Sequence, residues 1–139
     1  MQSISPETIF RGSHAWQKSL PQIIKLTKRP LILGRGINTN KLRNKIFNDL
    51  KNKNLNVNFA NLKFDCCYED ILRVKNIILE NNNDSVIAAG GGKVLDSGKY
   101  IADSLNIHCI TVPLSASTCA GWTALSLSLI HISEPTRPY

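Results

Sequence analysis

The sequence lacks several features that would assign it early to a class of protein. No apolar run is long enough to span a bilayer, and the N-terminus does not resemble a signal peptide. We therefore expect a cytoplasmic protein with no membrane partner. The four cysteines form no CxxC pair, and no histidine is spaced from them in a way that suits zinc. Adjacent Cys66 and Cys67 are expected to be reduced side chains rather than a redox pair.

Acidic residues are scarce, because 10 Asp and Glu face 17 Lys and Arg and leave a net charge of +7. Such a balance can indicate nucleic-acid binding, but that function needs clustered cations interleaved with aromatic side chains. Here aromatic residues make up only 6% of the chain. The lysines are spread over predicted helices and turns, so we expect solvated surfaces and no nucleic-acid partner. These lysines are Lys18, Lys25, Lys28, Lys41, Lys45, Lys51 and Lys53.

Short apolar segments alternate with segments of helical periodicity, and the 139 residues fit one domain. Strands are predicted at 7–11, 30–33, 55–59, 85–89 and 107–112, and helices at 13–24, 38–50, 68–80 and 93–105. Pro21 is expected to break or kink the first helix. Strands that are apolar throughout are typical of a sheet covered on both faces. The fold class is therefore α/β, with a parallel, Rossmann-like sheet and helices on both faces.

The segment from Ser85 to Asp96 carries the strongest functional signal. A short apolar strand leads into three glycines at positions 90–92, and a helix with Lys93 in its first turn follows. Glycines leave no Cβ between the backbone and a ligand, and the helix directs free N–H groups and its positive dipole end at the same point. This pattern favours a phosphate or pyrophosphate site. The alternative is a tight strand-to-helix turn without a ligand, with Lys93 simply in solvent.

The glycine run matches neither GxGxxG nor GxxxxGK[ST], which argues against an ordinary Rossmann fingerprint and against a P-loop. Asp96 is placed in the first turn of the helix, where it either contributes to the site or only stabilises the helix start. A hydroxyl-rich loop at 114–118 follows the strand at 107–112. Together with the turns at 34–36 and 90–92, this loop is expected at the carboxyl edge of the sheet, where such folds bind phosphates.

These motifs resemble the iron-containing alcohol dehydrogenase superfamily, and its glycerol dehydrogenase-like branch in particular. Residues 90–99 resemble the GGGK-x-x-D-x-x-K motif of that branch, and residues 110–113, 116–118 and 123–125 resemble its second cofactor segment. The resemblance covers residues 1–126 and implies the N-terminal dinucleotide-binding domain of a dehydroquinate synthase-like fold, without the C-terminal helical domain. It also implies hydride transfer between NAD or NADP and a small alcohol or polyol, with zinc or iron as the divalent metal.

Carried over by position, the resemblance implies contacts between the pyrophosphate and the glycine turn, and a cofactor cleft lined by residues of the second segment. The cofactor-binding candidates are Arg35, Gly91, Gly92, Lys93, Asp96, Ser117, Thr118, Thr123 and Leu125. Arg35 stands where the family often has an acidic residue for the adenine ribose, so a 2′-phosphate becomes an expected partner of this arginine. Cys119 stands where glycerol dehydrogenases have an aspartate that touches the substrate, and it is the one substrate candidate.

No catalytic residue and no metal ligand is assigned in this chain, because the resemblance places the metal ligands in the second domain. Residues 127–139 resemble a translated sequencing adapter, so they are interpreted as a non-native tail, expected to be disordered or loosely packed. The fragment alone is expected to be inactive, and the full-length protein to be a homo-oligomer. Alternatives are the glycerol-1-phosphate dehydrogenase branch, dehydroquinate synthase and a non-catalytic nucleotide-binding module.

Overall fold

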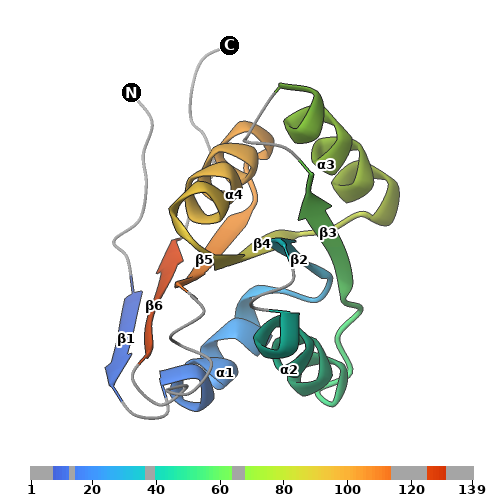
Figure 1. The fold of residues 1–139 in the computed structure, drawn as a ribbon. Coiled ribbons are helices and arrows are strands. Elements are labelled where there is room, and N and C mark those ends of the chain that lie inside the picture. The colour runs from blue at the N-terminus through green and yellow to red at the C-terminus, as the bar shows by residue number, and fades with distance from the viewer. Residues whose placement is uncertain (1–7, 13–14, 37–39, 64–67, 114–124, 131–139) are drawn as a thin grey trace, which may run out of the picture.

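The computed structural model describes residues 8–12, 15–36, 40–63, 68–113 and 125–130. Six strands form one sheet in the order β1-β6-β5-β4-β2-β3 (Figure 1). The elements are β1 (Thr8–Gly12), α1 (Ala15–Leu26), β2 (Pro30–Arg35), α2 (Asn40–Lys51), β3 (Asn58–Leu62), α3 (Tyr68–Asn81), β4 (Ser85–Gly90), α4 (Gly92–Leu105), β5 (His108–Pro113) and β6 (Leu125–Ile130).

Four neighbouring strands, β3, β2, β4 and β5, are parallel, which confirms the predicted α/β class. Leu33 of β2 pairs with Ala88 of β4, and Gly90 at the end of β4 pairs with Pro113 at the end of β5. The carboxyl ends of β2, β4 and β5 therefore lie side by side at one edge of the sheet. The predicted meeting of Gly34 and Gly90 at a common edge is confirmed.

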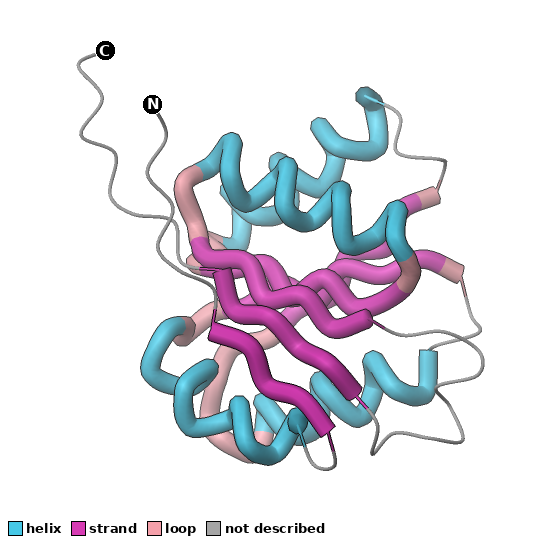
Figure 2. The backbone as a smooth tube through the Cα atoms, turned by 90° about the vertical axis from the view of Figure 1, so that its left-hand side faces the viewer, coloured by secondary structure: helices cyan, strands magenta, loops and turns pink. Residues whose placement is uncertain are grey.

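Helices cover both faces of the sheet, as Figure 2 shows. Helices α1 and α2 pack on one face around Trp16, Ile46 and Ile87, and α3 and α4 pack on the other around Leu33, Val74 and Ile101. Alternate residues of each central strand enter the two cores, since side chains along a strand point to opposite faces. The described residues form no second, helical domain, and no helix among them is long and apolar enough to cross a membrane.

One strand, β6, runs against the all-parallel sheet that the sequence predicts. β6 lies between β1 and β5 and is antiparallel to both, with Gly12 opposite Leu125 and Ile110 opposite Leu129. The expectation of a loosely packed tail from residue 127 is therefore wrong for 127–130, which complete β6. Their Leu-Ser alternation has the period of two that suits a strand. Residues 131–139 of the predicted tail lie outside the described residues.

One local prediction is also wrong, and of the two outcomes expected at Pro21, a break or a kink, the break does not occur. The predicted strand at 55–59 starts only at Asn58. Leu55 belongs instead to the capping turn that follows α2, because its N–H donates to the carbonyl of Leu50 at 3.3 Å. Asn54 adopts a left-handed φ of 66°, so α2 ends in a Schellman motif. Leu55 is the apolar residue of this motif, and in the sequence it extends the apolar–polar alternation of the strand that follows. Pro21 does not break α1, which continues to Leu26. Fully buried residues before and after this proline anchor the helix to the sheet.

Candidate functional site

The three glycines that link β4 to α4 have different surroundings. A Cβ on Gly90 would lie 3.0 Å from Cγ2 of Val94, so this glycine lets the helix start pack on the end of the strand. A Cβ on Gly91 or Gly92 would meet no atom of the described residues within 4 Å. The first glycine therefore has a packing role, and the next two border free space at the carboxyl edge of the sheet. This division fits a ligand that approaches the backbone of Gly91 and Gly92 closely.

Helix α4 begins at this free space without a side-chain cap. Its N-cap is Gly91, with φ −81° and ψ −172°, and no side chain accepts a hydrogen bond there. The first N–H groups of a helix have no intrahelical acceptors, so this end attracts an anion. Lys93 lies in the first turn as predicted, and it is exposed. Asp96 does not lie there: because the helix starts at Gly92, Asp96 opens the second turn, too late to stabilise the helix start.

A pocket of about 510 Å³ lies beside this helix start, between α3 and α4. Its size falls in the range of small-molecule sites. Positions 93, 96, 97 and 100 face it because they are three or four residues apart on α4. The lining residues are Tyr68, Ile71, Lys93, Asp96, Ser97 and Tyr100. Tyr68 and Tyr100 are among the large side chains that the structure leaves exposed, and the Nζ atom of Lys75 lies 5.3 Å from the centre of the Tyr100 ring.

A fourth glycine brings α4 close to the sheet. A Cβ on Gly98 would lie 2.5 Å from the Cβ of Ala88 in β4, so only glycine fits at this crossing without displacement. This contact, together with that between Gly90 and Val94, fixes the height of the helix above β4. The position of the helix N-terminus over the carboxyl edge follows from these two small-residue contacts.

The end of β2 is built around an arginine from α2. Arg43 is only 1% exposed, and its Nη2 donates to the carbonyl oxygen of Gly36 at 2.7 Å. Burial lowers the pKa of the Arg43 guanidinium from its ordinary value. Gly36 has a left-handed φ of 71°, which favours glycine at this turn. Arg35, the candidate for a 2′-phosphate, is the half-buried last residue of β2 beside this turn.

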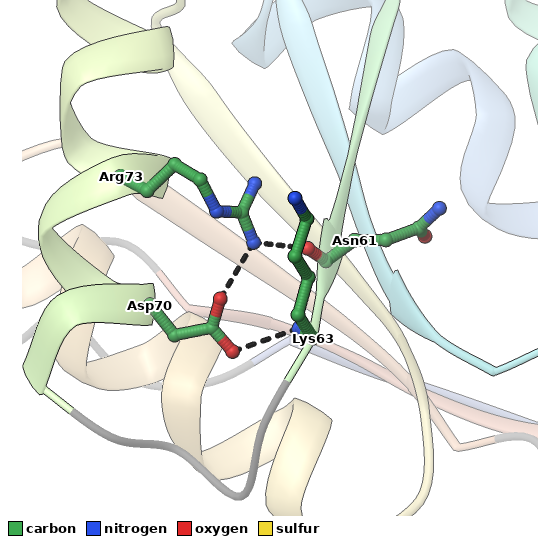
Figure 3. A network of polar contacts seen from close by, with 4 residues as sticks. All are labelled: Asn61, Lys63, Asp70 and Arg73. Carbon is green, nitrogen blue, oxygen red and sulfur yellow. Dashed lines mark hydrogen bonds and ion pairs between the residues drawn. The ribbon is translucent and has the colours of Figure 1, made fainter.

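A polar network closes the same edge at the end of β3 (Figure 3). The carboxylate of Asp70 is buried; it accepts hydrogen bonds from the N–H of Lys63 at 2.8 Å and from Nη2 of Arg73 at 2.6 Å. The same Nη2 also donates to the carbonyl oxygen of Asn61. The start of α3 is thereby held to the end of β3. This network fixes one wall of the pocket, because Ile71 follows Asp70 directly.

The remaining candidates are only partly described. Ser117, Thr118, Cys119 and Thr123 lie outside the described residues, and Leu125 is the first residue of β6. Within the described ranges, no group of three or more His, Cys, Asp and Glu side chains could hold a metal ion. The described residues therefore leave open space at the glycine turn and do not fit a metal centre.

Comparison with known proteins decides the family. The family model for iron-containing alcohol dehydrogenase matches residues 6–132. The chain belongs to this family. The match includes β1, β6 and the glycine turn, so the family pattern extends past the predicted domain end at residue 126.

Glycerol dehydrogenases are among the relatives of this iron-containing alcohol dehydrogenase chain. It is 29% identical to glycerol dehydrogenase 1 of Schizosaccharomyces pombe over 88% of its length, and 32% identical to an uncharacterized oxidoreductase of Synechocystis over 89%. The crystal structure of the S. pombe glycerol dehydrogenase superposes on 73% of the chain with a TM-score of 0.64 and 25% identity. The chain spans 27% and 32% of the two relatives and 26% of the crystal structure chain. The chain is thus glycerol dehydrogenase-like within its family, and matches about a third or less of such proteins.

Proposed function

We propose that the chain is the cofactor-binding part of a nicotinamide-dependent alcohol or polyol dehydrogenase. The observation that carries the proposal is the free space over Gly91 and Gly92 at an uncapped helix start. A pyrophosphate there would accept hydrogen bonds from the helix N–H groups and meet the favourable end of the dipole. Lys93, exposed in the first turn, would add a positive charge next to the same phosphates.

We propose roles for the other candidate residues around the pyrophosphate site at the glycine turn. Arg35 would meet the adenine ribose or its 2′-phosphate at the end of β2, and Asp96 would face the pocket between α3 and α4. Ser117, Thr118, Thr123 and Leu125 would line the cofactor cleft, and Cys119 would approach the alcohol. The residues of this chain would bind and orient the dinucleotide, whose nicotinamide would supply the hydride acceptor for the alcohol.

No catalytic step is derived through a metal, since the described residues do not fit one. We propose that zinc or iron binds with ligands other than the residues that the structure describes. A homo-oligomeric, cytoplasmic full-length enzyme also belongs to this proposal. Relatives named as glycerol dehydrogenases support the dehydrogenase part of this proposal.

Cofactor binding is tested by calorimetric titration of the 139-residue chain with NAD and with NADP. We expect one site with a dissociation constant of about 0.1–1 mM, since a partial site retains only part of the contacts. Inorganic pyrophosphate should compete, because it would occupy the same helix start. Absence of binding by a folded chain, or binding that pyrophosphate leaves unchanged, would overturn the proposed site.

Inactivity of the chain alone is tested by turnover. The chain is supplied with zinc or iron, NAD or NADP and a panel of small polyols, and reduced cofactor is followed by absorbance. We expect binding without turnover, since nothing in the described residues would polarise the alcohol. Metal-dependent turnover would contradict this part of the proposal and leave the cofactor site intact.

A further inference from the structure

Arg43 is a buried arginine to which the proposed function assigns no role. It lies in α2, on the face of the sheet opposite α4, and its side chain is 1% exposed. A cationic side chain this deeply buried is uncommon, because removing the charge from water is costly. Its position therefore needs a reason beyond the packing of the core.

The glycine at the end of β2 makes room for this arginine. A Cβ on Gly34 would lie 2.2 Å from Nε, 2.4 Å from Cδ and 2.5 Å from Cζ of Arg43. The guanidinium group thus lies directly against the backbone of Gly34 and reaches past it to the carbonyl oxygen of Gly36. One side chain from α2 contacts both ends of the turn 34–36.

The residue between these two contacts is Arg35. Arg35 is the last residue of β2, at the carboxyl edge, and β2 is the direct neighbour of β4, which carries the glycine turn. Gly36 holds a left-handed backbone and has no side chain of its own to fix it. Pairing with β3 holds the backbone of Gly34 and Arg35, and Arg43 packs against Gly34 and bonds the carbonyl of Gly36, where the strand pairing has ended.

We propose that Arg43 is a positioning residue for nucleotide recognition: it fixes the turn 34–36 so that Arg35 is aimed at the ribose 2′-phosphate of the dinucleotide. This inference rests on the proposed function. Arg43 does not touch the ligand and acts through the turn. The selectivity for a 2′-phosphate consequently depends on two arginines, one at the surface and one buried behind it.

The test compares the wild type with four variants of the 139-residue chain in calorimetric titrations with 2′,5′-ADP and 5′-ADP. Arg43→Met keeps the bulk and removes the bond to Gly36, and Arg43→Lys keeps a cationic donor. Arg29→Met is the matched control, because the Nε atom of Arg29 donates to the carbonyl of Asn82 at 2.8 Å, at the opposite end of the same strand. Gly34→Ala displaces the Arg43 side chain without changing it and serves if Arg43→Met does not fold.

We expect Arg43→Met and Gly34→Ala to weaken 2′,5′-ADP binding about tenfold and 5′-ADP binding much less, as the loss of one charge-assisted contact predicts. Arg43→Lys should restore most of the selectivity, and Arg29→Met should match the wild type. Amide hydrogen exchange at residues 34–36 should accelerate in Arg43→Met and Gly34→Ala, and should stay at the wild-type rate in Arg29→Met. A merely structural role would lower the thermal midpoint without changing the ratio of the two affinities.

Equal ratios of the two affinities in wild type and Arg43→Met, or unchanged exchange at residues 34–36, would overturn the inference. If the wild type binds neither adenylate, the proposed function fails by itself and the selectivity role fails with it. If the wild type binds both and the ratio does not depend on Arg43, only the positioning role fails. The two failures are thereby distinguishable.

Discussion

The two edges of the parallel sheet are built on opposite principles. At the amino edge, the carboxylate of Asp84 accepts hydrogen bonds from the hydroxyl of Thr27 and from the N–H groups of Lys28, at 2.8 Å, and Arg29, at 3.1 Å. Asn83 adds bonds from its Nδ2 to the carbonyl of Arg29 at 2.9 Å and to Oδ1 of Asn58 at 2.7 Å. Side chains there satisfy the backbone and close the connections before β2 and β4.

At the carboxyl edge, β4 ends in Gly90, β2 ends in Arg35 between two glycines, and the helix after β4 has no side-chain cap. Free space lies over Gly91 and Gly92, and the polar network of Asp70 and Arg73 closes only the neighbouring end of β3. An edge that satisfies its own backbone adds stability, whereas an edge that leaves donors uncapped can bind an anion. The comparison predicts that changes at one edge alter binding and changes at the other alter stability.

The largest effect is expected from Gly91→Val at the carboxyl edge. The valine side chain would occupy the free space at the helix start, and we expect nucleotide affinity to fall about 100-fold or more. Because the φ of Gly91 is −81°, valine introduces no left-handed strain, and the cost in stability should be about 1 kcal/mol or less. Calorimetry with NAD and urea unfolding measure the two quantities.

Gly91→Ala is the graded control for this prediction. Its single methyl group should produce an intermediate loss of affinity at unchanged stability. Retained affinity in the valine variant would mean that the phosphates bind elsewhere. The prediction that changes at the carboxyl edge alter binding would then be wrong.

At the amino edge, Asp84→Ala should have the reverse effect. Three donors lose their acceptor, and the free energy of unfolding should fall by about 2–3 kcal/mol, since hydrogen bonds to a charged group contribute more than neutral ones. Nucleotide affinity of the folded variant should stay within about twofold of the wild type. Urea unfolding and calorimetry at a temperature where the variant is folded provide the check.

Asp84→Asn retains one carbonyl acceptor and should lose less stability than the alanine variant. A fall in affinity that parallels the fall in stability across both variants would show that the two edges are coupled rather than independent.

A smaller effect is expected from Arg35→Ala. If Arg35 contacts a 2′-phosphate, the wild type should prefer NADP over NAD by about tenfold, as one charge-assisted contact would give. The alanine variant should bind both cofactors with similar affinity. Titration of both cofactors against both proteins decides this, and equal preference in both proteins would remove Arg35 from the site.

The sequence was informative where one local signal determines the structure. The glycines at 90–92 and the apolar strand before them predicted the turn and the strand ends at one edge, because only local backbone geometry is involved. Asp96 was misplaced since helix boundaries inferred from periodicity are uncertain by a residue or more, and one residue separates the first turn from the second. The alternation at 55–59 predicted a strand that begins too early, because Leu55 of the capping turn after α2 falls into the same apolar–polar pattern.

Long-range arrangement was less accessible. The insertion of β6 between β1 and β5 depends on residues more than 100 positions apart, and no local pattern distinguishes it from a parallel neighbour. No sequence pattern singled out Arg43, although the glycines at positions 34 and 36, which it contacts, flank Arg35. An arginine seven residues after a Gly-x-Gly strand end is a signal visible only once the packing is known.

The smallest effect concerns Cys109, the second residue of β5, close to the closed amino edge. Burial raises the pKa of this thiol to about 12 from 9.0, partly offset by the charge of Lys99. The folded state therefore keeps the proton that the unfolded chain releases above about pH 9. The stabilisation that comes from the buried, protonated thiol is fully present below that pH. It is lost as the pH rises toward 12, and the free energy of unfolding falls by about 1.4 kcal/mol per pH unit in this range.

Cys109→Ala isolates this contribution, because other groups titrate alike in both proteins. The variant should be less stable at pH 7, since it leaves a small cavity, and the difference from the wild type should narrow between pH 9 and pH 10 in urea unfolding. In native protein at pH 8, the peptide that carries Cys109 should escape alkylation by iodoacetamide, and it should react once urea unfolds the chain. Rapid alkylation of the native thiol would mean that water reaches the core past Asp84 and Asn83. The amino edge would then be no better closed than the carboxyl edge, and the contrast between them would rest on the glycine turn alone.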